Sequence, residues 1–285
     1  MAVRKAVFAG SWYPKQAAAC DQEIAQFLSE ADAPGAESSG WVAGIVPHAG
    51  WYYSGKIACQ VINCLRSSEP LDLVVVFGMH LHHASANHLM AEGAWETPFG
   101  ELPVATALAE TLMKQFSFEI ETPRRFVQDN TIELQLPFIK RLLDPRAFLG
   151  IGVPPAVQSF EIGRAVVDWA RENGKRLKLV GSTDLTHYGP NYGLTAHGSG
   201  EPALAWVRER NDRRVIDAML AMAPEQVLAE GISHQNACCS GAAATTIVAA
   251  RHAGASRSHP IAYATSYEKS PGTSFVGYTG IVFGR

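Results

Sequence analysis

The chain has 285 residues, of which 47% are hydrophobic and 18% charged, and its formal net charge is -3. This composition is typical of a soluble globular protein, and no lysine- or arginine-rich block provides the electrostatic footprint of a nucleic-acid binder. No apolar run approaches the roughly 20 residues of a membrane span. The five cysteines are few and odd in number, which favours reduced thiols. With no signal-peptide core at the N-terminus, we predict a cytoplasmic protein without a membrane or nucleic-acid partner.

Apolar runs and helical periodicity alternate along the first half of the chain. Uncharged apolar runs predict buried strands over residues 42–46 and 71–77. Apolar residues at helical spacing predict helices over 15–30, 56–65 and 103–116, with Pro103 in the first turn of the third.

The second half shows the same alternation after an irregular stretch. Residues 81–100 have no clean period and predict a long functional loop with at most one short strand. Asp129 and Asn130 are placed to cap a turn that begins at Thr131. Beyond it we predict strands over 148–153, 177–182, 261–267 and 275–283, and helices over 137–143, 160–173, 201–221 and 240–252.

Together these elements predict a single α/β domain over residues 1–285. We expect a mostly parallel central sheet flanked by helices, with antiparallel strands at the C-terminal end. We also expect a break near Asn211 in one of the helices. No linker, repeat or low-complexity tract divides the chain.

Side chains that could carry chemistry follow three of the predicted strands. They are His48 after the first, His80 and His82 after the second, and Asp184 with His187 after the strand at 177–182. Because the carboxyl ends of parallel strands meet at one edge of a sheet, we expect these groups to converge there. Imidazole and thiolate suit zinc, copper or ferrous iron, so a metal site is one interpretation. The alternatives are a hydrogen-bonded turn for His48 and a solvated loop for the histidines that follow residue 79.

Further polar residues have two interpretations each. Cys239 lies at the start of the last predicted helix, which favours a thiolate ligand or nucleophile, although most free cysteines are simply buried. We expect its neighbour Cys238 to point away into the core. Asp184 either orients the imidazole of His187 for proton transfer or caps a turn. Glu133 lies in a capped segment that can reach the site.

Seven motifs run in order from residue 9 to residue 283: AGSWYP, PHAGWYYSG, ETPFGE, NTIELQLPF, STDLTHYG, NACCSG and SFVGYTGIVF. As a set they resemble the Memo-like family, whose prokaryotic members are often called AmmeMemoRadiSam system protein B. The resemblance implies the fold of class III extradiol dioxygenases. A radical-SAM partner is implied by the family name alone.

Carried over by motif, the resemblance implies His48 and Cys239 as metal ligands. It implies His187, with Asp184 beside it, as an acid/base or supporting group. Asn130 departs from the family pattern, which often has a histidine there, so no further acid/base group is carried over to that loop.

The second histidine ligand is open between two positions. Family members commonly have Gly-x-x-His-His where this chain has GMHLHH at residues 78–83. We favour His80, because it lies closest to the end of the predicted strand, where the backbone position is best defined. His82 is the alternative.

We therefore expect a metal-dependent redox or oxygenase-type enzyme with a His/His/Cys site for one ion of iron or copper, zinc being an alternative. A thiolate in place of a carboxylate makes such a site softer, so catechol ring cleavage does not follow from the fold. The absence of P-loop, HExxH and GxSxG motifs argues against the enzyme classes that use them. The competing hypothesis is a non-catalytic module that binds a small molecule, peptide or anion in the same pocket, beside Trp12, Trp51, Tyr52 and Trp95.

Overall fold

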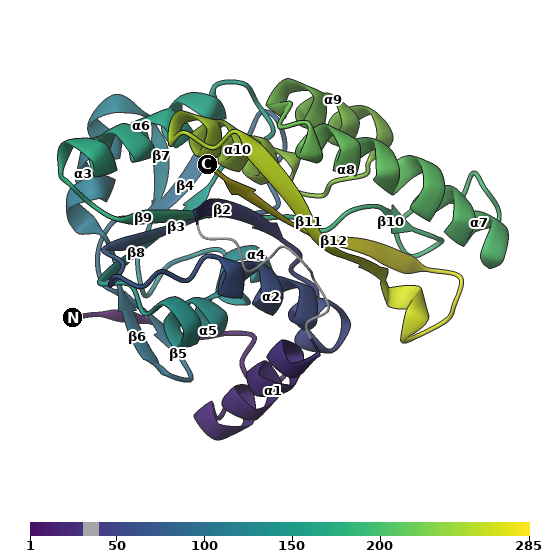
Figure 1. Cartoon of the computed structure of the whole chain (residues 1–285), viewed down its shortest axis with the longest axis horizontal. Coiled ribbons are helices and arrows are strands. Elements are labelled where there is room, and N and C mark those ends of the chain that lie inside the picture. The colour runs from purple at the N-terminus through teal and green to yellow at the C-terminus, as the bar shows by residue number, and fades with distance from the viewer. Residues whose placement is uncertain (31–39) are drawn as a thin grey trace.

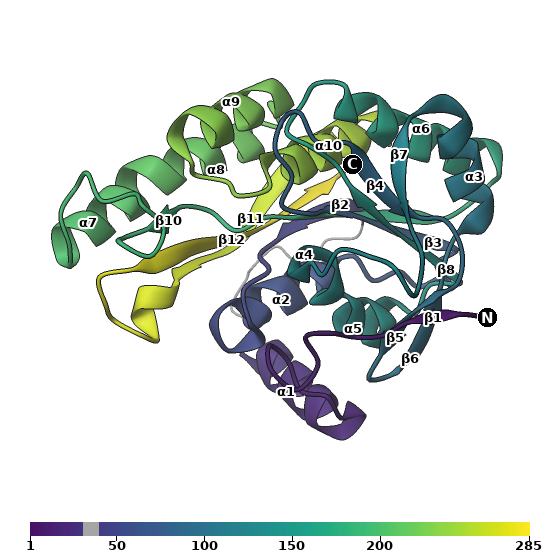
Figure 2. The same cartoon turned by 180° about the vertical axis from the view of Figure 1, so that it is seen from behind.

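A sheet of nine strands forms the centre of the molecule, and helices cover both of its faces (Figures 1 and 2). The computed structural model describes residues 1–30 and 40–285. Within these ranges no helix combines the length and the hydropathy that crossing a membrane demands. The predicted α/β fold class is confirmed.

Four parallel strands occupy the middle of the sheet. In spatial order they are β2 (Trp41–Val46), β9 (Leu177–Ser182), β3 (Leu73–Gly78) and β8 (Ala147–Gly152). Most of their residues are buried because helices cover both faces, which is why apolar runs with almost no charge predicted them correctly. Their carboxyl ends lie along one edge of the sheet.

Antiparallel and short strands complete the sheet on either side. Next to β2 lies β12 (Phe275–Gly284), which pairs antiparallel with β2, with β11 (Arg257–Thr265) and with β10 (His187–Tyr188). Next to β8 lies β4 (Asn87–Met90), antiparallel to β8, followed by β7 (Phe118–Glu121), parallel to β4. The antiparallel C-terminal strands are confirmed.

There is also a second, three-stranded sheet, and short strands of the two sheets correct two expectations. The second sheet consists of β1 (Val3–Arg4), β5 (Ala94–Thr97) and β6 (Gly100–Pro103). The expected loop over residues 81–100 therefore holds β4 and β5, whose four-residue lengths are too short to show a period. Pro103 ends β6 instead of starting a helix, and the helix begins at Thr106.

Helices form a layer on each face of the central sheet. One face carries α1 (Ala17–Ser29), α2 (Lys56–Cys64), α4 (Asn130–Glu133) and α5 (Leu136–Phe138), with π-helical turns at Trp51–Gly55 and Ile139–Leu143. The other face carries α3 (Thr106–Gln115), α6 (Ser159–Glu172), α7 (Glu201–Trp206), α8 (Asp212–Leu220), α9 (Pro224–His234) and α10 (Ser240–His252), as Figure 1 shows. A 3-10 turn covers Ser266–Glu268.

Small residues bring α10 close to the central strands. A Cβ atom at Gly181 of β9 would lie 2.5 Å from Thr246 Oγ1 and 3.0 Å from the carbonyl oxygen of Ala242. Only glycine fits there, so α10 lies directly against β9. This packing places the start of α10 beside the carboxyl ends of the strands, where Cys239 N donates to Thr183 Oγ1.

The expected break near Asn211 is a π-helical turn over Val207–Asn211, between α7 and α8. The Asn211 side chain donates to Thr186 Oγ1 at 3.0 Å and to the carbonyl oxygen of His234 at 3.1 Å. The next residue, the buried Asp212, accepts from Thr186 N at 3.0 Å. The break thus anchors the segment that leads into β10.

Candidate metal centre

Four side chains with metal-binding atoms converge at the carboxyl-end edge of the central strands. His48 follows β2, His80 follows β3, and Cys238 and Cys239 immediately precede α10. One ligand atom from each lies within 4.8 Å of all the others. The expected convergence is present, and it includes one sulfur that we did not expect.

The buried ring of His48 is held in one orientation by Ser182. His48 Nδ1 lies 3.0 Å from Ser182 Oγ. That hydroxyl donates its hydrogen to the carbonyl oxygen of Thr131 at 2.7 Å, so it accepts from His48 Nδ1–H. His48 Nε2 then faces the cluster, 3.3 Å from Cys238 Sγ. Because Nδ1 keeps its proton, Nε2 is the atom that binds an ion, once it gives up the proton that it shares with the Cys238 sulfur.

Asp129 orients His80 in the same manner. Its Oδ2 lies 3.1 Å from His80 Nδ1 and accepts from the His80 backbone N–H at 3.2 Å. Burial lowers the pKa of His80, but the hydrogen bonds and charges of Asp129 and Cys238 together outweigh it and raise the pKa to about 10. Burial disfavours the Asp129 carboxylate, yet the hydrogen bonds from His80 and Thr131 lower its pKa to about 2. The His80 ring faces that of His48, with the ring centroids 4.9 Å apart.

The structure places His80, and not His82, in this cluster. Met79, between β3 and His80, has a φ of 72°, an unusual conformation for a residue with a side chain. Its N–H donates to Thr131 Oγ1 at 2.7 Å, which holds this turn. His82 is exposed, and its N–H donates to Ser85 Oγ at 3.0 Å.

Both cysteine sulfurs belong to the cluster, which corrects the expectation that Cys238 points away. Neighbouring side chains diverge in a strand, but Cys239 lies in a turn with φ -125° and ψ 53°, and the two sulfurs are 3.8 Å apart. Burial opposes ionisation of the Cys238 thiol, but the hydrogen bond with Cys239 and the charge of His48 hold its pKa well below the ordinary value. Burial and the adjacent Cys238 raise the pKa of Cys239. Ionisation of the pair is therefore favoured at Cys238 over Cys239.

Asp184 lies between two imidazoles. Its Oδ2 is 3.9 Å from Nε2 of His48 and 3.9 Å from Nε2 of His187, and its Oδ1 accepts from the His48 backbone N–H at 2.7 Å. Burial raises the pKa of Asp184, which the charge of His48 partly offsets. Burial lowers the pKa of His187, but the Cys238 sulfur and the Asp184 carboxylate leave it raised. Asp184 is thus placed beside His187, where the sequence suggested.

A cavity of about 600 Å³ opens beside the cluster. His48, His80, Asp184 and His187 lie on its wall. Much of the remaining wall is aromatic, with Trp12, Tyr52, Tyr53, Tyr192 and Tyr278. Trp12 and Tyr52 lie where we expected them, whereas Trp95 lies elsewhere, with the Arg4 guanidinium carbon 3.9 Å from its ring centroid. Tyr192 reaches the cavity from a segment whose approach no local pattern indicated.

Trp51 and Glu133, which we expected at the pocket, lie behind it. Trp51 is stacked on Phe138 with ring centroids 4.0 Å apart, and its indole donates to the carbonyl oxygen of Leu134. The Glu133 carboxylate accepts from the backbone N–H groups of residues 7 and 8 and from the hydroxyl of Tyr13. Glu133 therefore anchors the N-terminal segment that carries Trp12 into the cavity wall.

Comparisons with known proteins point to a single family. The profile of the family described as Memo-like protein matches residues 4–282. The chain belongs to the Memo family. A MEMO1 family protein of Methanothermobacter thermautotrophicus is 31% identical over 97% of this chain and 98% of its own length. One from Thermococcus onnurineus is 30% identical over 99% of both chains, and one from Methanopyrus kandleri is 32% identical over 85% of this chain and 82% of its own.

A solved structure has a similar fold at low sequence identity. It is an uncharacterized protein from Escherichia coli K12, with a TM-score of 0.55 and 14% identity, and the match covers 86% of this chain and all of that one. This likeness bears on the fold of the Memo family chain alone.

Proposed function

We propose that the chain is a metal-dependent enzyme of redox or oxygenase type. His48, His80 and Cys239 hold one metal ion, with Cys238 as a further sulfur donor, and the aromatic cavity receives the substrate. The observation that carries the proposal is the convergence of four ligand atoms within 4.8 Å beside a cavity of about 600 Å³. Family membership is compatible with this proposal but does not by itself supply an activity.

The donor set fits a metal ion by distance. Nitrogen and sulfur ligands about 2.0–2.3 Å from an ion in tetrahedral geometry lie roughly 3.3–3.8 Å apart. The separation of His48 Nε2 from Cys238 Sγ is 3.3 Å, and that of the two sulfurs is 3.8 Å. Two sulfurs and two imidazoles are a soft donor set, which favours copper over iron and leaves zinc as an alternative.

The chain's own residues would handle binding and protons. A bound copper or iron ion would supply a Lewis-acidic, redox-active centre. His187 lies on the cavity wall, with its imidazole beside the Cys238 sulfur and the Asp184 carboxylate, and it exchanges a proton with a substrate in the cavity. Asp184, with Oδ2 3.9 Å away, stabilises the protonated imidazole. The aromatic wall that includes Tyr52 and Tyr192 binds the apolar part of the substrate.

Metal analysis of protein made and purified without oxygen tests the proposal. We expect stoichiometric iron, copper or zinc in the parent chain, its loss in His48→Ala, and a clear loss in Cys239→Ser. His82→Ala is the matched control, because it removes a nearby histidine that lies outside the cluster, and it should retain the metal. A parent chain without stoichiometric metal, or full retention in His48→Ala, would contradict the proposal.

A non-catalytic binding module is the second candidate. The half-open aromatic wall, in which Trp12 is 41% and Tyr52 61% exposed, favours it, because such side chains suit a peptide or another amphipathic ligand. Ligand binding that survives a chelator, with no turnover in the metal-loaded protein, would support this function over the first. A radical-SAM partner stays a proposal that rests on the family name.

A further inference from the structure

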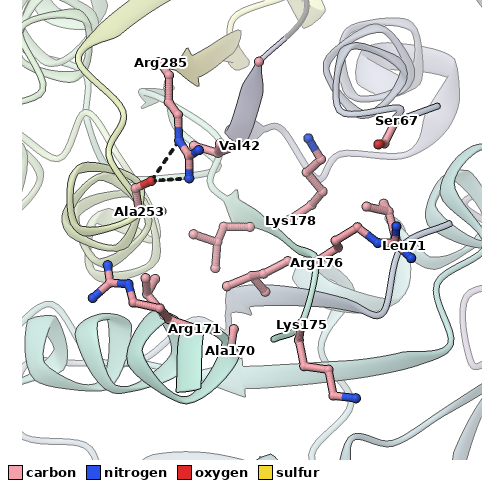
Figure 3. Close-up of a pocket in the computed structure, with 14 residues that line it drawn as sticks. Val42, Ser67, Leu71, Ala170, Arg171, Lys175, Arg176, Lys178, Ala253 and Arg285 are labelled. Carbon is pink, nitrogen blue, oxygen red and sulfur yellow. Dashed lines mark hydrogen bonds between the residues drawn. The ribbon is translucent and has the colours of Figure 1, made fainter. Parts of the chain in front are cut away.

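A second cavity, of about 380 Å³, lies at the opposite end of the central strands. It is bounded by the starts of β2 and β9, by the turn between α6 and β9, by the segment before β3, and by the last residue, Arg285. Figure 3 shows the side chains that surround it. The strand β9 separates it from the metal-binding cluster by roughly 15 Å, at about 3.3 Å a residue.

The side chains that line this cavity are strongly biased in charge. Five of them are cationic, and none of the lining residues is acidic, although the chain as a whole has a net charge of -3. The cationic residues are Arg171, Lys175, Arg176, Lys178 and Arg285. They come from different elements and extend around an apolar centre (Figure 3).

Two of these cations already have acidic partners outside the cavity wall. Arg176 pairs with Glu69 at 3.3 Å and with Asp72 at 3.6 Å. Arg171 pairs with Asp168 at 3.1 Å. Their charges are compensated within the protein.

Lys175, Lys178 and Arg285 form no ion pair with a carboxylate side chain among the described residues, and the Lys175 side chain extends away from the other two (Figure 3). The ammonium of Lys178 donates to the carbonyl oxygen of Trp41, and the guanidinium of Arg285 donates to that of Ala253 at 3.0 and 3.2 Å. Both groups keep unused donors, because an ammonium has three and a guanidinium five. Burial lowers the pKa of Lys178, and the charge of Arg285 lowers it further, so the two cations lie close enough to repel one another.

The alternative explanation for these cationic side chains is structural, because some of them cap the end of a helix. Arg171 donates to the carbonyl oxygen of His252 at 3.0 Å, and Arg285 to that of Ala253, so both satisfy the end of α10. Capping accounts for these guanidinium groups. It does not account for Lys178, which lies in a strand, half-buried, at the start of β9.

The floor of the cavity suits the organic part of a ligand. It is formed by the apolar side chains of Val42, Leu71, Val167, Leu177 and Leu179. A volume of about 380 Å³ is within the range of small-molecule pockets. An apolar floor beside Lys178 and Arg285, which have no carboxylate partner, suits a small organic dianion.

We propose that this cavity binds a small organic phosphate monoester, with its phosphate between Lys178 and Arg285 and its organic part on the apolar floor. A dianion neutralises both cations, whereas a monocarboxylate neutralises one. A guanidinium also matches phosphate oxygens geometrically.

Calorimetric titration of the full chain with phenyl phosphate tests the proposal. Lys178→Met removes the charge but keeps an apolar stem, and we expect it to weaken binding by about tenfold or more. Arg285→Met should weaken it similarly and serves if the first variant does not fold. Lys114→Met is the matched control, since it removes an exposed lysine on α3, and it should bind like the parent.

Two comparisons separate this site from other sources of binding. Benzoate should bind at least about tenfold more weakly than phenyl phosphate, because it carries one charge. Equal binding of the two ligands would overturn the assignment to a dianion. If the parent chain showed no saturable binding of phenyl phosphate, the proposed site would be overturned. It would also be overturned if the parent, Lys178→Met and Arg285→Met bound phenyl phosphate with equal affinity, because the ligand would then bind elsewhere.

Discussion

The two ends of the central strands hold opposite kinds of side chain. At the carboxyl ends, hydroxyl and carboxylate side chains hold the imidazoles in place, as Ser182 holds His48 and Asp129 holds His80. At the amino ends, cationic side chains surround an apolar floor, and Lys178 is held by a main-chain carbonyl group.

The two ends of the strands differ in whether the protein itself supplies partners for the polar side chains. At the carboxyl ends the fold supplies them, so the ligand atoms are fixed before any ion arrives, which is the condition for a selective metal site. At the amino ends the fold leaves Lys178 and Arg285 without a carboxylate, so their counter-charge must come from solvent or from a ligand. Side chains held by hydrogen bonds within the protein indicate the metal site, and cationic side chains without a carboxylate partner indicate an anion site.

The largest expected effect comes from removing the carboxylate that orients His80. Asp129→Ala deletes the cap of α4 and leaves the N–H groups of His80 and Thr131 without their acceptor. We expect a loss of about 2–3 kcal/mol in the free energy of unfolding and of about 10–100-fold in metal affinity. Urea unfolding and chelator competition measure the two.

Asp217→Ala is the control for this change, because it removes an exposed carboxylate that pairs with Arg213. It should cost less than about 1 kcal/mol and leave metal affinity unchanged. If Asp129→Ala behaved like this control, the carboxyl-end site would not depend on an orienting carboxylate.

A pH-dependent effect is expected at Asp212, which anchors the segment before His187. Burial raises the Asp212 pKa to about 6 from 3.8, despite hydrogen bonds from Thr186 and Tyr263. The folded state therefore binds the proton more tightly than the unfolded state, so the stability that Asp212 contributes is present below about pH 4 and lost as pH rises through about 6. Relative to Asp212→Asn, the parent chain should lose up to about 3 kcal/mol over this interval. A stability difference that does not change with pH would contradict the assignment.

Ser182→Ala should have a smaller effect, on metal affinity. The change removes the acceptor that holds the proton on His48 Nδ1, so part of the imidazole population presents a protonated Nε2 to the cluster. We expect metal affinity to fall by about tenfold, measured by chelator competition. Unchanged affinity in a folded variant would mean that another group sets the tautomer.

The smallest effect is expected at the amino ends. Lys178→Met should change the free energy of unfolding by less than about 1 kcal/mol, because the lost hydrogen bond to Trp41 is offset by removal of the repulsion from Arg285. Urea unfolding at low and high salt measures this. A loss of more than about 2 kcal/mol would mean that Lys178 is a structural residue and would weaken the contrast between the two ends.

Strands that are buried on both faces could be predicted from the sequence. The four central strands are apolar runs of six residues because both faces are covered, and the cap at Asp129 is a local interaction with Thr131 N. The short strands β4 to β7 could not be predicted, because each has four residues and is stabilised by pairing with distant segments.

Of the candidate site, the approach of the two histidines could be predicted from the sequence, and the remaining contacts could not. His48 and His80 follow recognisable strands, so their approach to one edge follows from parallel pairing. The direction of Cys238 depends on the turn before α10, for which no residue pattern gives a signal. The contact of Asp129 with His80 spans 49 positions, and no local pattern predicts it.

X-ray absorption at the copper edge of the anaerobically copper-loaded chain tests the central claim most directly. The account predicts a mixed shell, with sulfur at about 2.3 Å and imidazole nitrogen at about 2.0 Å from the ion, and a reduced sulfur contribution in Cys238→Ser and in Cys239→Ser. A shell of nitrogen and oxygen alone, identical in both variants, would contradict a metal centre built on the cysteine pair.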